Sequence, residues 1–335
     1  MNKLVSVIIP CYNGEKFIDQ SIESVYIQDY TPIELIVVDD ESTDGSADRI
    51  KSWQSRFAEK GNSLKYVYQK NRGPGGATDT GLKHVTGEYL TLLDADDVLL
   101  PGAVRKKAEF LDENPDYAGV RNNGWRVSGD GRSLFITDPE EKKITDLFSA
   151  LCDDKTNNWA GTYMIRTAIL FTQYPDRNIN PSRFGQNFQI LLPVAYRQKF
   201  GFIDEPLMEY HIQKDSHSHS ADLEVQYQKS IANINGWQDI FCEIIQWLVK
   251  DQQERKEYLN RYDAVSKRSA MVQAAELAHI QDMRRFYVAL NQTGLVTLDD
   301  HIIFARIEYP FLVLPLRLAR KIQSIGTKIS KQKAN

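Results

Sequence analysis

Three aspartates follow one apolar run of the chain in quick succession. Asp94, Asp96 and Asp97 come directly after residues 89–93. Carboxylates two positions apart on a turning backbone can face one space, and their hard oxygen atoms suit Mg²⁺ or Mn²⁺. A divalent ion held there would neutralise a leaving diphosphate. Aspartates also cap helices, so Asp97 could instead serve the helix expected from Pro101, and the Asp-x-Asp spacing alone is a weak signal.

Similar polar clusters follow three other apolar runs of the first 120 residues. They lie at residues 11–13, 39–44 and 71–76. The first offers the ring of Tyr12 for stacking a base, and the second offers carboxylates that could accept hydrogen bonds from a ribose or a base N–H. Turn-forming residues follow strands for ordinary reasons too. Four clusters that end neighbouring parallel strands nevertheless predict one ligand site.

The elements that must position these clusters alternate between strand and helix. Apolar, β-branched runs predict buried strands at 5–9, 33–38, 64–68 and 89–93. Helical spacing and start signals predict helices at 15–28, 46–58, 75–85 and 101–111. This alternation predicts an α/β fold with a mostly parallel, Rossmann-like sheet flanked by helices. The pattern is irregular from residue 117 to about residue 220, and the chain from about residue 221 onward is predicted to be a helical extension.

Composition and charge exclude several classes of protein. The 335 residues carry 41 Lys and Arg against 45 Asp and Glu, so we expect no nucleic-acid partner. Three separated cysteines exclude a disulfide framework and a cysteine-based zinc site, and they fit a reducing compartment. The sequence shows neither a signal peptide nor a run of 18 apolar residues, so we expect a cytoplasmic protein.

The sequence also lacks the two best-known nucleotide motifs. No GxGxxG follows the first strand and no GxxxxGK[ST] is present, which argues against a dinucleotide fold and a P-loop. A nucleotide site without either motif, next to an Asp-x-Asp pair, points to a nucleotide sugar as the ligand.

Four motifs resemble those of family 2 glycosyltransferases with the GT-A fold, in their order and spacing. They are VSVIIPCYN at 5–13, ELIVVDDESTD at 34–44, NRGPGGATDTGL at 71–82 and GEYLTLLDADDVLLP at 87–101. A weaker similarity continues over 183–211, and the region after about residue 221 is not covered. The resemblance implies a GT-A domain at 1–220, with a nucleotide-sugar half at 1–120 and an acceptor half at 121–220, followed by the helical region 221–335.

The resemblance also implies an activity. It is the inverting, metal-dependent transfer of a sugar from a nucleotide sugar, with UDP favoured as the nucleotide, to a hydroxyl of a glycan or lipid-linked acceptor. A role in cell-surface polysaccharide synthesis follows from the same resemblance. The acceptor hydroxyl would attack the anomeric carbon in line and expel the nucleoside diphosphate, and a base should remove the hydroxyl proton.

The resemblance assigns roles to individual residues of the nucleotide-sugar half. Contacts with the nucleotide sugar are expected from Pro10, Tyr12, Asp39, Asp40, Asn71, Gly75, Asp79 and Asp94. Asp96 would hold Mn²⁺ or Mg²⁺ and so take part in catalysis. Enzymes of this fold often draw a late metal ligand from the stretch after residue 210, where His217 is our first choice and His211 the second.

Two positions depart from the family pattern. Ala77-Thr78-Asp79 stands where Ala-Arg-Asn is usual, which leaves one nucleotide contact open. Gln186 and Asn187 stand where the family carries an acidic pair whose carboxylate is the base, and neither amide can take up a proton at neutral pH. Three accounts remain. The base is another carboxylate, such as Asp204, Glu205 or Asp215; or the amides position the acceptor while another group or water takes the proton; or the protein is inactive.

On the acceptor side we expect contacts from Arg183 and Trp159. Arg183 belongs to the polar neighbourhood of Gln186 and Asn187. The ring of Trp159 lies beside the small residues Ala160 and Gly161 and could stack on the apolar face of a sugar. Packing inside the fold is the alternative role for this ring.

The C-terminal segment 309–335 is basic and free of acidic residues. Its apolar residues recur at helical spacing at 311, 314, 318, 322, 325 and 329, and six Lys or Arg accompany them. Such a segment suits an anionic surface, so we expect peripheral contact with the inner face of the cell membrane. A helix docked on the protein, or a contact in a homo-oligomer, is the alternative.

Two other functions compete with a transferase. A nucleotidyltransferase would normally show a glycine-rich basic loop after the first strand, where this chain has only residues 11–16. A degenerate GT-A protein would bind a nucleotide or a glycan without turnover, and the amide pair Gln186-Asn187 is the best sequence evidence for it.

Overall fold

The computed structural model describes residues 2–129, 131–157, 159–212, 220, 222–315, 317 and 320. It divides into two compact units. The first unit comprises Met1–Gln213 and Asp239–Leu248, and the second comprises Lys214–Gln238 and Val249–Asn335. The long helix α10 (Leu223–Leu248) therefore contributes residues to both units.

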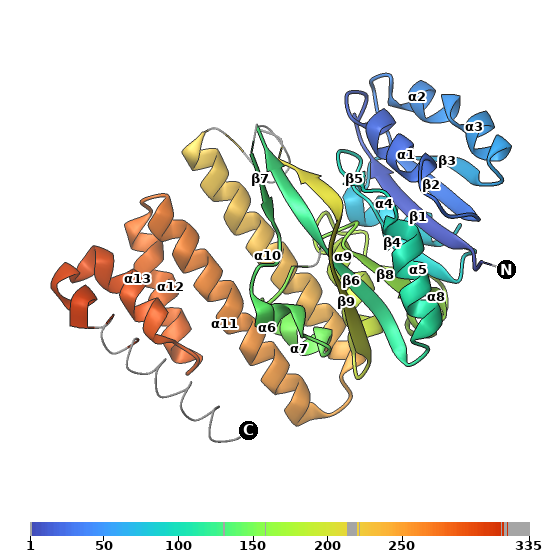
Figure 1. Ribbon diagram of the computed structural model, residues 1–335. Helices are drawn as coiled ribbons and strands as arrows, with labels where there is room; N and C mark the ends of the chain where they lie inside the picture. Colours follow the sequence, from blue (N-terminus) through green and yellow to red (C-terminus); the bar gives the residue numbers. More distant parts are fainter. Residues whose placement is uncertain are drawn as a thin grey trace. The chain divides into compact units, whose positions relative to one another are not determined.

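The first unit is built on one mixed sheet of nine strands in the order β3-β2-β1-β4-β8-β6-β9-β5, with β7 paired to β6 (Figure 1). The strands are β1 (Val5–Cys11), β2 (Ile33–Asp40), β3 (Ser63–Gln69), β4 (Tyr89–Leu92), β5 (Val98–Leu99), β6 (Tyr117–Ser128), β7 (Gly131–Leu134), β8 (Tyr163–Arg166) and β9 (Lys199–His211). β1 to β4 run parallel, as the strand–helix alternation predicts. The other half is mixed, because β8 runs antiparallel to both β4 and β6.

Helices cover both faces of this sheet (Figure 1). They are α1 (Ile18–Tyr26), α2 (Ser46–Ser52), α3 (Gln54–Glu59), α4 (Gly73–Leu82), α5 (Ala103–Glu113), α6 (Pro139–Lys142), α7 (Leu147–Cys152), α8 (Thr167–Gln173) and α9 (Gln186–Ala195). The predicted helix at 46–58 is in fact two helices, α2 and α3, which meet at Trp53. β1, β2 and β4 are largely apolar on both sides because both of their faces are buried, whereas the edge strand β3 has exposed positions.

Packing explains where the strands and helices meet. Val7 and Ile9 on one face of β1 share a core with Ile22 of α1. On the other face α4 lies close to β1, and a Cβ on Gly81 would come within 2.7 Å of the Cγ2 atom of Ile8. Glycine at this position therefore allows the helix to approach the strand.

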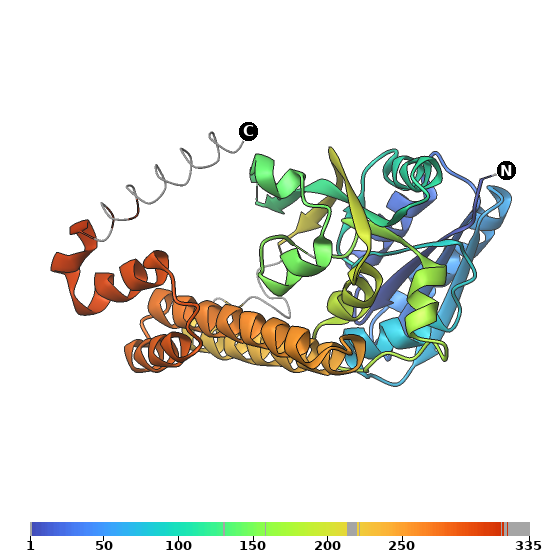
Figure 2. The same ribbon diagram turned by 90° about the horizontal axis from the view of Figure 1, so that it is seen from below.

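The second unit is helical in its described residues. It contains the first part of α10, α11 (Gln252–Glu276), α12 (Ile280–Gln292), α13 (Leu298–Glu308) and the turn η1 (Pro310–Leu312). The first part of α10 lies beside α11 (Figure 2), and Tyr227 joins Met271 and Met283 in one apolar core. Arg268 binds the buried carboxylate of Asp300, which also caps α13. Within the described residues no helix combines the length and apolarity that a membrane span requires.

Candidate functional site

The polar clusters predicted from the sequence meet at the edge of the sheet where β1 to β4 end (Figure 1). Cys11 pairs with Asp39, and Asp40 pairs with Gln69, so three strands end in register. Side chains then link the loops. The backbone N–H of Asn13 donates to Ser42 Oγ at 3.0 Å, and Asn13 Oδ1 accepts from the backbone N–H of residue 43 at 2.8 Å. We call this edge the carboxyl edge.

Asp39 and Asp40 form the frame of the carboxyl edge. Asp40 is buried and accepts hydrogen bonds from the backbone N–H groups of Arg72 at 2.9 Å and Gly73 at 2.8 Å. Asp39 is also buried, and its Oδ2 accepts from the hydroxyl of Tyr66 at 2.7 Å. Both carboxylates thus hold the loops in place from within the protein.

The loop before α9 lies against the loop before α4. A Cβ on Gly75 would clash with the carbonyl oxygen of Ser182, so only glycine allows this approach. Arg183 Nη2 donates to Asn71 Oδ1 at 3.0 Å. The structure therefore brings the predicted acceptor residue Arg183 to the predicted nucleotide residues Asn71 and Gly75.

Two predicted nucleotide residues have very different surroundings. Tyr12 is 56% exposed at the end of β1, with Pro10 half-buried behind it in the strand. Asp79 is buried in α4 and accepts hydrogen bonds from Arg72, Lys83 and the backbone N–H of Ile179 at 3.3, 3.1 and 3.0 Å. The carboxylate of Asp79 is thus engaged within the protein, whereas the ring of Tyr12 is open to solvent.

Asp94, Asp96 and Asp97 crowd one turn after β4. Burial, followed by the charge of Asp96, raises the pKa of Asp94 to about 7. Burial also raises the pKa of Asp96 and that of Asp97, and the two neighbouring carboxylates raise the latter further. Ser21 Oγ holds this turn by donating to the carbonyl oxygens of Ala95 and Asp97 at 2.8 and 2.7 Å. The turn therefore brings three carboxyl groups together, and none of them forms an ion pair among the described residues.

A divalent cation fits this group of carboxylates. Within the described ranges no three His, Cys, Asp or Glu side chains are preassembled as metal ligands. Mg²⁺ commonly needs only one or two carboxylates, because water and substrate phosphates complete its shell. Buried Asp97 Oδ2 has no hydrogen-bond partner among the described residues. Burial first, and then the neighbouring carboxylates, raise the pKa values of Asp94 and Asp97, and a bound cation would counteract both effects. The donor chemistry therefore agrees with the metal predicted at Asp96.

Of the two histidines predicted as metal ligands, His211 is among the described residues and His217 lies outside them. His211, at the end of β9, donates its backbone N–H to Asp97 Oδ1 at 3.0 Å, and its Nε2 lies 3.4 Å from Glu209 Oε2. The charge of His211 lowers the pKa of Asp96, although the larger effect of burial leaves that pKa raised. The second choice among the histidines is therefore next to the aspartates.

Tyr163 connects the carboxylates to the amide pair Gln186-Asn187. Its ring is fully buried at the start of β8, and its hydroxyl donates to Asn187 Oδ1 at 2.7 Å. Burial, followed by the charge of Asp94, raises the pKa of Tyr163 well above its usual value. Gln186 and Asn187 open α9 and are half-buried, and among the described residues the Gln186 amide has no hydrogen-bond partner. Sequence reasoning missed Tyr163, although a buried tyrosine hydroxyl always requires a partner.

The other carboxylates considered as bases are held in ion pairs. Asp204 Oδ2 lies 2.7 Å from Lys142 Nζ, and Asn123 donates to its other oxygen at 3.2 Å. The hydrogen bond from Lys142 lowers the pKa of Asp204, which makes it a weaker base. Glu205 pairs with Lys106. Asp215 lies outside the described residues.

The ring of Trp159 has packing partners on several sides. It stacks on Tyr210 with ring centroids 5.2 Å apart, meets Phe135 edge-on at 4.5 Å and lies 5.0 Å from the Arg126 guanidinium. Burial, followed by Asp97, Asp94 and Asp96, raises the pKa of Tyr210 to about 12. The ring of Trp159 thus has the surroundings expected for packing inside the fold, which was the alternative to stacking on a sugar. Its partner Tyr210 lies near the three aspartates.

Two buried cations near this edge carry no recognisable sequence signal. Arg121 on β6 is 2% exposed and donates to Thr156 Oγ1, while its Nε and Nη2 have no hydrogen-bond partner among the described residues. Burial lowers its pKa to about 10. Lys107 on α5 is fully buried, and its Nζ donates to the carbonyl oxygen of Gly161 at 3.0 Å. Burial lowers the pKa of Lys107 to about 7.

Comparison with known proteins identifies relatives of the first unit. Residues 6–171 match the family model described as glycosyl transferase family 2. An uncharacterized glycosyltransferase of Nostoc is 32% identical over 46% of this chain and 47% of its own length. One of Rickettsia bellii is 38% identical over 63% of this chain and 29% of its own. The chain thus spans less than half the length of these relatives.

Solved structures share the fold at low sequence identity. TarS 1–349 of S. aureus in complex with UDP-GlcNAc is 19% identical, with a TM-score of 0.58, over 92% of this chain and 91% of that one. The mannosyltransferase PcManGT of Pyrobaculum calidifontis in complex with GDP-Man and Mn²⁺ is 17% identical, also with a TM-score of 0.58, over 97% of this chain and 85% of that one. Both likenesses show that the fold is of the GT-A type.

Proposed function

Because residues 6–171 place this chain in glycosyl transferase family 2, we propose that it transfers a sugar from a nucleotide sugar to a hydroxyl group of an acceptor. The observation that carries the proposal is the group of three aspartates that crowd one turn of the carboxyl edge, where Asp97 Oδ2 is buried without a hydrogen-bond partner among the described residues. UDP is the favoured nucleotide, and the fold shared with a UDP-GlcNAc complex supports it.

The nucleotide has a place at the carboxyl edge in this proposal. The exposed ring of Tyr12 stacks on the base beside Pro10, and Asp39 and Asp40 keep the surrounding loops in position. Asn71 and Gly75 lie against the nucleotide, and Asp94 contacts the ribose. Asp79 supports this site from behind by holding Arg72.

A bound Mn²⁺ or Mg²⁺ would be held by Asp96, with Asp94 and His211 beside it. Such an ion supplies the positive charge that stabilises a leaving diphosphate. The Mn²⁺ in the structural neighbour from Pyrobaculum calidifontis supports this assignment. The protein residues contribute by crowding carboxylates in a turn that Ser21 keeps rigid.

Transfer proceeds with inversion at the anomeric carbon in this proposal. The acceptor oxygen forms a bond to that carbon while the bond to the diphosphate oxygen breaks, and the electron pair leaves with the diphosphate. The hydroxyl proton passes to water, since the Gln186 and Asn187 amides cannot accept it. We favour the account in which these amides position the acceptor, because Asp204 and Glu205 are held in ion pairs. Arg183 contacts the acceptor from the adjoining loop.

The acceptor class and the place of action follow from the C-terminal segment. Phe311 and Leu314 are 74% and 68% exposed, and Tyr309 and Leu312 are also exposed. The sequence from 309 to 335 is basic and acid-free, although residues 321–335 lie outside the described residues. Apolar anchors beside cations suit an anionic membrane. We therefore propose a lipid-linked or glycan acceptor at the inner face of the membrane, in cell-surface polysaccharide synthesis.

The first test is thermal unfolding with nucleoside diphosphates, each with and without Mn²⁺. We expect UDP with Mn²⁺ to raise the unfolding midpoint, since a ligand of the native state stabilises it by mass action. Asp96→Ala should abolish this rise. Asp112→Asn, which removes a carboxylate at the opposite edge of the sheet, should preserve it. The absence of a shift with every nucleotide would contradict the donor site.

A second test separates the transferase from a degenerate relative that only binds. UDP release is measured from a panel of UDP-sugars with simple methyl glycosides as acceptor probes. Turnover supports the transferase. Binding without any turnover would favour the non-catalytic alternative, for which the amide pair Gln186-Asn187 is the supporting observation.

A further inference from the structure

The hydroxyl of Tyr163 determines what Asn187 can offer a ligand. Tyr163 is fully buried, so its hydroxyl needs a partner within the protein, and it donates to Asn187 Oδ1 at 2.7 Å. The carbonyl side of the amide is therefore turned toward the sheet. Its Nδ2 has no hydrogen-bond partner among the described residues, and Asn187 is only half-buried.

This hydrogen bond runs from the hydroxyl of Tyr163 to the amide oxygen of Asn187. A tyrosine hydroxyl carries its proton at neutral pH and can therefore donate it to this oxygen. The same bond therefore leaves the two N–H donors of Asn187 free, which is the opposite of what a carboxylate at this position would present.

The backbone of Asn187 is held as firmly as its side chain. Gly185 precedes α9 with a φ of +71°, and a Cβ there would lie 2.9 Å from the Cγ2 atom of Ile240. Phe188, the next residue along α9, packs edge-on against Phe241. The start of α9 is thus anchored by α10 on one side and by Tyr163 on the other, as an oriented binding group requires.

From this geometry we propose that Tyr163 is a positioning residue for the transfer reaction. It orients Asn187 so that Nδ2 donates a hydrogen bond to a hydroxyl oxygen of the acceptor. This inference rests on the proposed function and extends it by giving the amide a defined donor role. The acceptor class that it selects is one with a further hydroxyl group, beside the attacking one, that accepts this hydrogen bond.

The test compares Tyr163→Phe with a matched loss of a buried hydroxyl elsewhere. Tyr30 is also buried, and its hydroxyl donates to the carbonyl oxygen of Lys3 at 2.6 Å, at the other edge of the sheet. UDP release is measured from the UDP-sugar and methyl glycoside pair that the wild-type chain uses. We expect Tyr163→Phe to lower kcat/KM for the glycoside about tenfold and to leave KM for the UDP-sugar unchanged. Tyr30→Phe should leave both unchanged.

A double-mutant cycle then asks whether the effect passes through Asn187. In an Asn187→Ala background, Tyr163→Phe should cause no further loss, because the group that it orients is gone. Full additivity of the two losses would overturn the proposal, as would unchanged kinetics in Tyr163→Phe. If the wild-type chain released UDP from no UDP-sugar, the proposed function would fail, and this role with it. The experiment therefore distinguishes failure of the positioning role of Tyr163 from failure of the proposed transferase function.

Discussion

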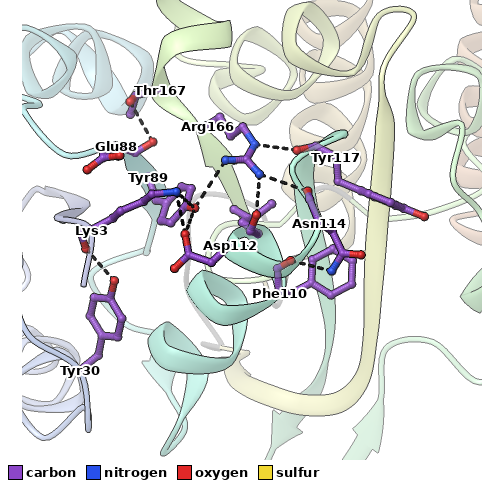
Figure 3. Close-up of polar contacts among 11 residues, drawn as sticks. Lys3, Tyr30, Glu88, Tyr89, Phe110, Asp112, Asn114, Tyr117, Arg166 and Thr167 are labelled. Atoms are coloured by element: carbon purple, nitrogen blue, oxygen red, sulfur yellow. Dashed lines mark hydrogen bonds and ion pairs between the residues drawn. The ribbon is translucent and has the colours of Figure 1, made fainter. Parts of the chain in front are cut away.

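The two edges of the central sheet treat charge in opposite ways. At the edge where β1 and β4 begin, Lys3, Tyr89, Asp112 and Arg166 form a closed network of hydrogen bonds and ion pairs (Figure 3). At the carboxyl edge, three aspartates share one turn. Burial raises the pKa of each of them, and the charge of His211 offsets part of that rise at Asp96. One edge pairs its charged groups with one another, and the other holds carboxyl groups close together without ion pairs among the described residues.

At the first of these edges, which we call the amino edge, the charged side chains have hydrogen-bond partners within the protein. Arg166 donates to the carbonyl oxygens of Tyr117, Leu111 and Asn114 at 2.8, 2.6 and 3.2 Å, and so caps the end of α5 (Figure 3). Burial alone would raise the pKa of Asp112, but hydrogen bonds from Lys3 and Tyr89 outweigh it and hold that pKa below its usual value. The network therefore stabilises the ionised carboxylate.

The largest effect is expected at the carboxyl edge and on activity. Asp96→Ala should lower kcat/KM by about a thousandfold, or about 4 kcal/mol of transition-state stabilisation, because it removes the cation ligand that we propose. Its unfolding midpoint without ligand should not fall, since the substitution relieves repulsion among carboxylates. Steady-state kinetics and calorimetry check the two parts. Substantial residual activity would remove Asp96 from the cation site.

The next prediction compares the free energy of unfolding after the loss of one arginine near each edge. Arg166→Met should lower the free energy of unfolding by about 3 kcal/mol, because it leaves carbonyl groups without their charged donor. Arg121→Met should change it by less than about 1 kcal/mol, since two nitrogens of that guanidinium have no partner among the described residues. Urea unfolding of both variants measures the difference. Equal losses would show that the contrast between the edges is not energetic.

A smaller effect concerns pH and the buried Lys107. Its native pKa of about 7 lies below that of an exposed lysine, so the unfolded chain binds the extra proton between these values. Wild-type stability should therefore rise relative to Lys107→Met by about 2 kcal/mol between pH 7 and pH 9. Below pH 7 the difference should become constant. Unfolding curves at several pH values test this, and parallel pH profiles would mean that the lysine is solvated.

The smallest effect is expected for the two carboxylates held in ion pairs, Asp204 and Glu205, which we do not propose as the base. Asp204→Asn and Glu205→Gln should change kcat by less than about twofold and stability by less than about 1 kcal/mol, as exposed ion pairs contribute little. A loss of kcat above tenfold in either variant would return that carboxylate to the reaction. The pH dependence of kcat would then show its ionisation.

Sequence patterns predicted the elements that are buried on both faces. The strands near 5–9, 33–38 and 89–93 are largely apolar, because parallel strands under two layers of helices have no polar side. The strand near 64–68 lies at the edge of the sheet, where Leu64 is buried and Lys65 is exposed. The polar clusters at their ends could also be placed, since strand direction determines which edge they share. The prediction of a GT-A fold, based on family resemblance, is confirmed by the solved structures of that type.

The parts of the site that escaped prediction depend on contacts distant in sequence. Tyr163 meets Asn187 across 24 positions, and Arg183 meets Asn71 across 112. Lys107 and Arg121 are buried although charged, which no local pattern indicates. The individual roles predicted for the site residues stay predictions, because geometry alone does not show a bound ligand. Tertiary packing, and not local preference, decides these positions.

Helix α10 has a practical consequence for anyone who expresses part of this protein. Its residues 239–248 belong to the first unit, where Phe241 and Ile245 are fully buried. A chain that stopped at residue 220, where the sequence pattern turns helical, would lack this piece of the core and would expose the apolar side of α9. The shortest stretch that carries the complete first unit runs to Leu248 and includes a segment of the second. No single cut separates the two units.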